Sequence, residues 1–272
     1  MPGLDIIVVA NGCTDNTAEI ARSFGQYVRV ICIPTASKHL AMLTGDQAAT
    51  SFPRIYVDAD VELGMLDVLA LDAELRKPGV LAAAPTRVLP LDGCPWPVRC
   101  YYDIWSRLPE VRHGLFARGV VAVNEAGHRR IAALPPLMAD DLAASLSFSS
   151  SERRIAAGAR VIYHPPRRFA DLLRRRVRAV TGVAQIERSG QAPPSTERTR
   201  PADLMAVLRD HPAAATRLVV FVTVTLIARL VARRAIARGD YTTWLRDESS
   251  RRAAASAWSS ADRAAAQGRR PG

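Results

Sequence analysis

The chain has few aromatic residues, no cysteine pairs and no long apolar run, and each absence argues against a class of protein. Aromatic residues make up only 6% of the 272 residues, and the basic residues are not interleaved with them as a single-strand nucleic-acid binder requires. The four cysteines lack C-x-x-C and zinc-site spacing, which favours free thiols in a reducing compartment. No basic stretch precedes an apolar core near Met1, so we expect no signal peptide.

The charge is divided unevenly along the chain. The net charge is +11 overall, with −3 in residues 1–150 and +14 in residues 151–272. A basic second half can meet nucleic acid, anionic lipid or a phosphorylated substrate. Almost all the basic residues are arginine, which favours bidentate contacts with phosphate.

The first 57 residues alternate between strand and helix patterns. The apolar run Ile6 to Ala10 predicts a buried strand, and strands are also predicted over residues 27–33 and 54–57. Helices are predicted after Asn11 and over residues 37–50. This β-α-β-α-β order predicts an α/β fold with a doubly wound, mostly parallel sheet. Ligands bind such sheets beyond the carboxyl ends of the strands, where Asn11 and Asp58 fall.

The rest of the chain suggests further segments. Residues 85–118 are rich in Pro, Trp, Tyr and Arg and predict an irregular insertion. A helix is predicted from about Asp141 and a strand over residues 160–163. We expect a catalytic domain over residues 1–188, a linker over 189–202, a helical and possibly membrane-associated segment over 203–248, and a disordered tail over 249–272.

Two acidic motifs contain the candidate functional residues of the chain. Asp58 and Asp60 follow a predicted strand with one alanine between them. Carboxylates this close repel each other unless a positive group holds them, and a divalent cation is one such group. Asp140 and Asp141 precede an apolar helix. The simpler alternatives are solvated loop acids for the first pair and a helix N-cap for the second.

The order of these motifs resembles the family-2-type glycosyltransferases. A strand, "NGCTDNTAEIA", a second strand, Lys-x-x-Ala, a third strand, "DAD" and a later acidic pair follow one another over roughly residues 4–185. The resemblance implies the glycosyltransferase A-type fold, with a C-terminal helical extension added here, and nucleotide-sugar donors. This chain begins at what resembles the second strand of the family domain, so the first strand is expected to be missing.

The resemblance also implies roles for single residues. Asn11 would contact the nucleobase, and Lys38 would belong to the nucleotide-sugar site. Asp58 and Asp60 match the D-x-D motif, which holds the ribose and a Mg²⁺ or Mn²⁺ on the diphosphate.

Residues later in the chain would carry the reaction. Asp140 and Asp141 match the family's acidic pair, of which the second member is the catalytic base. Three arginines, Arg175, Arg176 and Arg178, would add positive charge near the diphosphate, with Arg178 falling on an arginine of the family pattern.

The resulting expectation is a metal-dependent, inverting transfer of sugar from a nucleotide-diphosphate sugar to a glycan or lipid acceptor, with no nucleic-acid partner. Two alternatives stay open. A nucleotidyltransferase can also place D-x-D at a strand end, although no Gly-rich phosphate loop is visible. A degenerate module could bind nucleotides or anionic surfaces without catalysis.

The apolar run Leu218 to Ala228 raises the question of a membrane. It has eleven residues, whereas a spanning helix needs about twenty. Arginines flank it, so the pattern predicts a helix in the interface of an anionic membrane, with a buried helix as the alternative. We therefore expect a cytoplasmic protein at the inner face of the plasma membrane.

Overall fold

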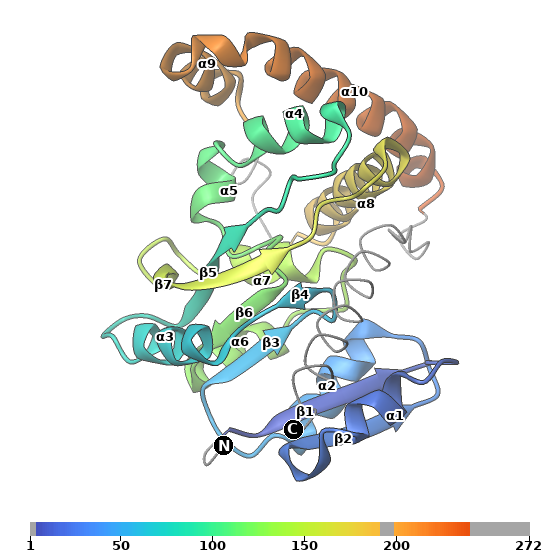
Figure 1. The fold of residues 1–272 in the computed structure, drawn as a ribbon, viewed down its shortest axis with the longest axis vertical. Helices are drawn as coiled ribbons and strands as arrows, with labels where there is room; N and C mark the ends of the chain where they lie inside the picture. Colours follow the sequence, from blue (N-terminus) through green and yellow to red (C-terminus); the bar gives the residue numbers. More distant parts are fainter. Residues whose placement is uncertain (1–3, 191–198, 240–272) are drawn as a thin grey trace, which may run out of the picture. The chain divides into compact units, whose positions relative to one another are not determined.

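A computed structural model describes residues 4–190 and 199–239 of the chain (Figure 1). The chain divides into two compact units, Met1–Phe52 and Pro53–Gly272. Residues 191–198 of the predicted linker, residues 240–248 of the predicted helical segment and the predicted tail over 249–272 lie outside the described residues.

The first unit is a two-stranded parallel sheet with helices. Strands β1 (Ile6–Asn11) and β2 (Val28–Ile33) pair in parallel, and α1 (Thr17–Arg22) with the short η1 (Gly25–Tyr27) connects them. Helix α2 (Lys38–Ala48) follows β2. Gly12, directly after β1, has φ +58, and a Cβ there would lie 2.7 Å from Cβ of Ala36. The turn after β1 therefore requires glycine.

The second unit contains a mixed five-stranded sheet. Its strands are β3 (Arg54–Val57), β4 (Val61–Glu62), β5 (Ala82–Val88), β6 (Val120–Val123) and β7 (Arg153–Tyr163), in the order β3-β6-β5-β7-β4. Only β5 and β7 pair in parallel, and the other three pairings are antiparallel. The predicted doubly wound, mostly parallel sheet of the glycosyltransferase A type is therefore wrong.

The prediction of the sheet is wrong because it assigns β3 the wrong partner strand. The apolar pattern correctly predicts the strand Arg54–Val57, but the strand does not extend the sheet of β1 and β2. It pairs antiparallel with β6, whose four residues are all buried. Strands β3 and β4 end the strand order yet are joined by the turn Asp58 to Asp60, so the sheet curls until these edges approach each other (Figure 1).

Both faces of this sheet are buried, because alternate side chains point to opposite faces. Ala83, Val120 and Ala122 pack with Leu71 and Leu75 of α3 (Met65–Leu75). The residues between them, Ala82, Ala84, Val121 and Val123, pack on the other face with Leu115 and Phe148. Helix α6 (Glu125–Ala132) follows β6, and α7 (Asp140–Leu146) ends just before Phe148.

The second unit also contains a layer of helices. They are α4 (Trp96–Trp105), α5 (Pro109–His113), α8 (Phe169–Arg188), α9 (Pro201–Asp210), η2 (Pro212–Ala214) and α10 (Ala215–Ala237). The irregular insertion predicted over residues 85–118 is thus wrong, because this stretch holds the end of β5 and two helices. Tyr101 of α4 stacks on Phe221 of α10 at 5.0 Å between ring centroids, so aromatic packing organises the layer.

Helix α10 extends the predicted apolar run in both directions. In residues 4–190 and 199–239, Pro212–Ala237 is the one helical stretch long and apolar enough to cross a membrane, by length and composition alone. Phe221, Val224, Ala228 and Ala232 form a buried face of this helix. The helix therefore contributes to the core of the second unit.

Candidate functional site

The first acidic pair lies in the turn between β3 and β4. Asp58 and Asp60 are both half-buried. The backbone N–H of Asp58 donates to the carbonyl oxygen of Gly119 at 2.7 Å. This bond continues the pairing of β3 with β6 by one residue and fixes where the turn begins.

Gly119 permits the close approach of β6 to this turn. It has φ +68, and a Cβ there would lie 2.4 Å from Cγ1 of Val61 and 3.5 Å from Cβ of Asp58. Both the backbone angle and the contact with Val61 exclude a side chain. Gly119 is therefore a structural requirement of the Asp58 to Asp60 turn.

The second acidic pair begins α7. Asp141 accepts hydrogen bonds through both carboxylate oxygens, from the backbone N–H of Ala117 at 2.7 Å and of Leu142 at 2.8 Å. Ala117 is the only non-glycine residue with positive φ, 51°, in the described part of the chain. Ser145, one helical turn later, accepts the N–H of Leu115 at 3.0 Å. Helix α7 thus holds the backbone of residues 115–117.

The two acidic pairs are connected through one short segment. We call Leu115 to Gly119 the connecting segment. Its Ala117 bonds Asp141, and its Gly119 bonds Asp58 two residues later. The two motifs are 80 positions apart in sequence, counted from Asp60 to Asp140, and the connecting segment forms hydrogen bonds with a residue of each.

Two arginines secure the connecting segment. Arg87 of β5 donates to the carbonyl oxygens of Ala117 at 2.7 Å and Phe116 at 3.1 Å, and its guanidinium lies 4.5 Å from the ring centroid of Trp105. Burial lowers the pKa of Arg87 to about 10, an effect that Tyr163, Tyr102 and Asp141 oppose. Arg87 therefore remains charged at neutral pH and supplies a positive group near Asp141.

Arg118 is the second of these arginines and is almost fully buried. Its guanidinium donates to four backbone carbonyl oxygens, those of Gly114, Pro85, Val111 and Arg112, at 2.9–3.1 Å. Burial lowers the pKa of Arg118 to about 9, and the nearby Arg87 contributes to the shift. Four charge-assisted bonds from Arg118 thus attach the connecting segment to β5 and to the residues that precede the segment.

Helix α8 contributes an arginine, Arg175, that contacts Tyr163 of β7. Arg175 donates to the hydroxyl of Tyr163 at 2.9 Å. Burial raises the pKa of Tyr163 to about 12; Arg175 and Arg178 oppose this rise, whereas Asp60 adds to it. Arg175 therefore contacts the Tyr163 hydroxyl directly, whereas Asp60 and Arg178 act on it through their charge.

Arg176 lies apart from this group. Its guanidinium is 5.5 Å from the ring centroid of Tyr101, within the helical layer. Residues one position apart on a helix point about 100° away from each other. The structure thus brings Arg175 to Tyr163 and turns Arg176 towards α4.

Helix α8 also positions the residues that precede Asp140. Gln185 accepts the backbone N–H of Met138 at 2.8 Å. A Cβ on Gly182 would lie 2.7 Å from Cβ of Ala139. The same helix therefore bonds Tyr163 of β7 through Arg175 and supports the residues that precede Asp140.

Asn11 and Lys38 belong to the first unit. Asn11 ends β1 and pairs in register with Ile33. Lys38 begins α2, whose N-cap Ser37 accepts the N–H of Leu40 at 3.2 Å. Because β1 and β2 are parallel, Asn11 and the loop that precedes Lys38 lie at the same edge of the small sheet.

The donor groups available to a metal are few. No group of three or more His, Cys, Asp or Glu residues that could hold a metal occurs within the described ranges. Asp58 and Asp60 supply two carboxylates. Two protein carboxylates suit Mg²⁺ or Mn²⁺ when water and a substrate diphosphate complete the coordination.

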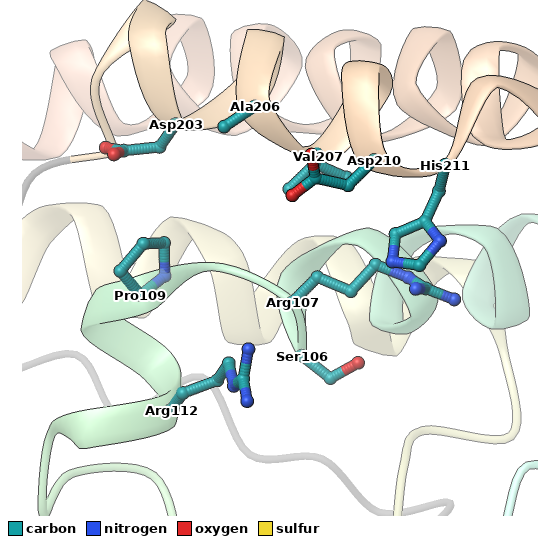
Figure 2. Close-up of a pocket in the computed structure, with 9 residues that line it drawn as sticks. All are labelled: Ser106, Arg107, Pro109, Arg112, Asp203, Ala206, Val207, Asp210 and His211. Carbon is teal, nitrogen blue, oxygen red and sulfur yellow. The ribbon is translucent and has the colours of Figure 1, made fainter.

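A separate hollow of about 370 Å³ lies between α9 and the α4–α5 region (Figure 2). Arg107 and Arg112 line one wall and Asp203, Asp210 and His211 the other. None of the predicted site residues lines this hollow, and its opposite charges face each other across it.

Sequence reasoning missed several residues of the site. They are Arg87, Ala117, Arg118, Gly119 and Tyr163. Only Gly119 could have been found from local sequence, because a glycine directly before an apolar strand indicates a turn. The other four depend on contacts between residues distant in sequence.

Comparison with known proteins leaves the family open. No family model matches the chain, and no curated protein matches it. One solved structure that matches is that of a mycobacterial protein, with 18% sequence identity and a TM-score of 0.46. The match covers 70% of this chain and 66% of that chain. Similarity at this level carries no argument about function, so the site itself has to supply one.

Proposed function

We propose that the protein transfers a sugar from a nucleotide-diphosphate sugar to a glycan or lipid acceptor, with inversion and with a divalent metal ion. The observation that carries the proposal is the connecting segment. Through Gly119 and Ala117 it joins a turn with two carboxylates to a third carboxylate, Asp141. Metal-dependent transfer needs both kinds of group near one substrate.

The turn is the proposed diphosphate site. Asp58 and Asp60 would hold Mg²⁺ or Mn²⁺, which as a Lewis acid neutralises charge on a leaving diphosphate. Arg175, which donates to Tyr163, and Arg178, on the same helix, would add hydrogen-bond donors and positive charge for phosphate oxygens.

Asp141 is the proposed general base. A carboxylate has about four lone-pair positions, and the N–H groups of Ala117 and Leu142 occupy two of them. These bonds orient the carboxylate and leave capacity to accept the proton of the acceptor hydroxyl. In the proposed step the hydroxyl oxygen bonds to the anomeric carbon, the bond to the diphosphate breaks, and the proton passes to Asp141.

The location belongs to the same proposal. We place the protein in the cytoplasm, at the inner face of the plasma membrane. The supporting observation is the net charge of +14 after residue 150, because anionic lipids of the cytoplasmic leaflet attract basic segments.

The reaction is tested with a panel of nucleotide-diphosphate sugars and the full chain. The assay measures release of nucleoside diphosphate with Mg²⁺, with Mn²⁺ and after chelation. Metal-dependent release that rises on addition of a glycan or lipid acceptor is the expected result. A nucleotidyltransferase would instead take a nucleoside triphosphate and release pyrophosphate. Binding of nucleotide without any turnover would indicate a degenerate module.

A further inference from the structure

The outward side of α10 carries a row of exposed apolar residues. Val219, Leu226 and Leu230 have exposed fractions of 65%, 52% and 59%. With the exposed Thr223 they are spaced by four, three and four residues, so all four lie on one face of the helix. We call them the outward stripe. Exposed apolar residues that form a continuous row mark a surface that binds another apolar surface.

The opposite side of α10 is fixed to the rest of the second unit. Phe221 stacks on Tyr101, and Ala228 and Ala232 pack with Val177 of α8. Near the start of the helix, Arg217 pairs with Asp103 at 3.0 Å, and near its end Arg188 donates to the carbonyl of Ile236 at 3.0 Å. A helix held along its whole length in this way cannot be surrounded by lipid on all sides, as a spanning helix is.

The charged residues of α10 that lie around the outward stripe are all positive. Arg229 and Arg233 flank the stripe on one side and Arg234 on the other, by the 100° turn per residue of an α-helix, and all three are exposed. The sequence of α10 contains no Asp or Glu. A second protein surface would need to be both apolar and acidic to match it, and an anionic lipid surface has both properties.

We infer that α10 docks on an anionic membrane surface through the outward stripe, lying in the plane of the interface with its opposite face still packed on α4 and α8. The arginines then reach lipid phosphates while their aliphatic stems cover apolar surface. Phe221, although it belongs to the apolar run of the predicted interfacial helix, does not face the lipid, because it is only 4% exposed. This inference shares with the proposed function only the membrane location, and it holds without the transfer reaction.

The test is flotation of the full chain with vesicles of phosphatidylcholine, with or without phosphatidylglycerol. Binding should require phosphatidylglycerol and should weaken at high salt without vanishing, because burial of the stripe is insensitive to salt. The variant Leu226→Ser with Leu230→Ser should lower partitioning about tenfold or more at any salt concentration. Each of Arg229→Gln, Arg233→Gln and Arg234→Gln should lower it roughly fivefold at low salt.

Matched control variants distinguish binding through the outward stripe from nonspecific binding of the protein to vesicles. Leu66 and Leu69 of α3 are 79% and 55% exposed, so Leu66→Ser with Leu69→Ser removes similar apolar area elsewhere. Arg129→Gln removes an exposed charge from α6. Both controls should float like the parent chain, and thermal melts should show that every variant is folded.

Three results would overturn the inference. The first is a parent chain that does not float with anionic vesicles. The second is extraction from membranes only by detergent, which indicates a spanning helix. The third is a dimer in solution that dissociates in the Leu226 and Leu230 variant without any flotation, which makes a second copy the occupant of the stripe. Because the assay reads lipid binding alone, loss of sugar transfer leaves its outcome unchanged.

Discussion

The two acidic pairs are alike in sequence but are held in different ways. In the turn, Asp58 is fixed through its backbone N–H, and no residue within the described ranges forms a hydrogen bond with the carboxylate of Asp60. In α7, the carboxylate of Asp141 itself accepts two backbone N–H groups. One pair leaves a carboxylate for a ligand, and the other uses a carboxylate to hold the connecting segment.

This difference separates two kinds of functional carboxylate. A group that serves only a ligand can lose its charge without harm to the fold. A group that also satisfies buried N–H donors cannot, because its removal leaves those donors unpaired. Substitutions in the two pairs should therefore differ in stability even when both reduce activity.

The largest effect is expected for Asp141→Asn. If Asp141 is the base, the transfer rate should fall by about two to four orders of magnitude. The amide also cannot accept through both of its atoms, so the free energy of unfolding should fall by about 1–3 kcal/mol. Single-turnover kinetics and chemical denaturation measure the two quantities.

Ser145→Ala is the control for Asp141→Asn, because it removes the hydrogen bonds that the Ser145 hydroxyl accepts from Leu115 of the same segment and from Arg153, and leaves the carboxylate. It should lower stability by a similar amount of about 1–3 kcal/mol. An equal loss of transfer rate in both variants would mean that Asp141 acts only by holding the segment.

Gly119→Ala should have the next largest effect, because it disturbs the turn from the side of β6. The added Cβ would overlap Val61, and the backbone at φ +68 disfavours alanine. Together these effects should lower the free energy of unfolding by about 3 kcal/mol.

Gly79→Ala isolates the backbone contribution. Gly79 has φ +79 with nothing within 4 Å of its Cβ position. The free energy of unfolding of this variant should therefore fall by only about 1 kcal/mol. Equal losses in denaturation of the two variants would refute the close approach of β6 to the turn.

Asp60→Asn should change binding and leave stability nearly unchanged. Its carboxylate is proposed to hold the metal, so Mn²⁺-dependent affinity for a nucleoside diphosphate should fall roughly 100-fold, or about 2.7 kcal/mol. Titration calorimetry measures the affinity, and a thermal melt should match that of the parent chain. Glu62→Gln, two residues later, is the matched control and should bind normally. If Asp60→Asn and the parent chain show equal metal-dependent binding, Asp60 does not hold a metal ion.

Local patterns in the sequence predicted individual elements well. Strands β1 and β3, helix α2 and the start of α7 were predicted within about two residues, because apolar periodicity and capping residues act over short distances. The parallel pairing of β1 and β2 was also predicted correctly. The acidic pairs were identified as candidates for the same local reason.

The pairing of strands that are distant in the chain could not be predicted from the sequence. Nothing in the residues Arg54 to Val57 indicates that their partner is β6, 66 positions later, so the predicted sheet was wrong. Helix α4 was missed because its proline and aromatic residues suggest irregular structure, whereas Tyr101 and Trp105 are buried in a helical layer. Arg87 and Arg118 bond only main-chain carbonyls, and such bonds leave no partner pattern in the sequence.

The smallest effect is expected for Ala117→Gly. Ala117 holds φ 51, a left-handed conformation that costs a non-glycine residue about 1 kcal/mol. Glycine removes this strain but gains about as much conformational freedom in the unfolded chain, so stability should change by less than about 0.5 kcal/mol. Ala133 is at a right-handed position with φ −81, so Ala133→Gly relieves no strain. Its free energy of unfolding should fall by about 0.5–1 kcal/mol. The N–H that Ala117 donates to Asp141 belongs to the main chain, so transfer should stay within about twofold of the parent rate. If chemical denaturation shows equal losses for both glycine variants, the connecting segment does not hold the left-handed turn that presents this N–H to Asp141.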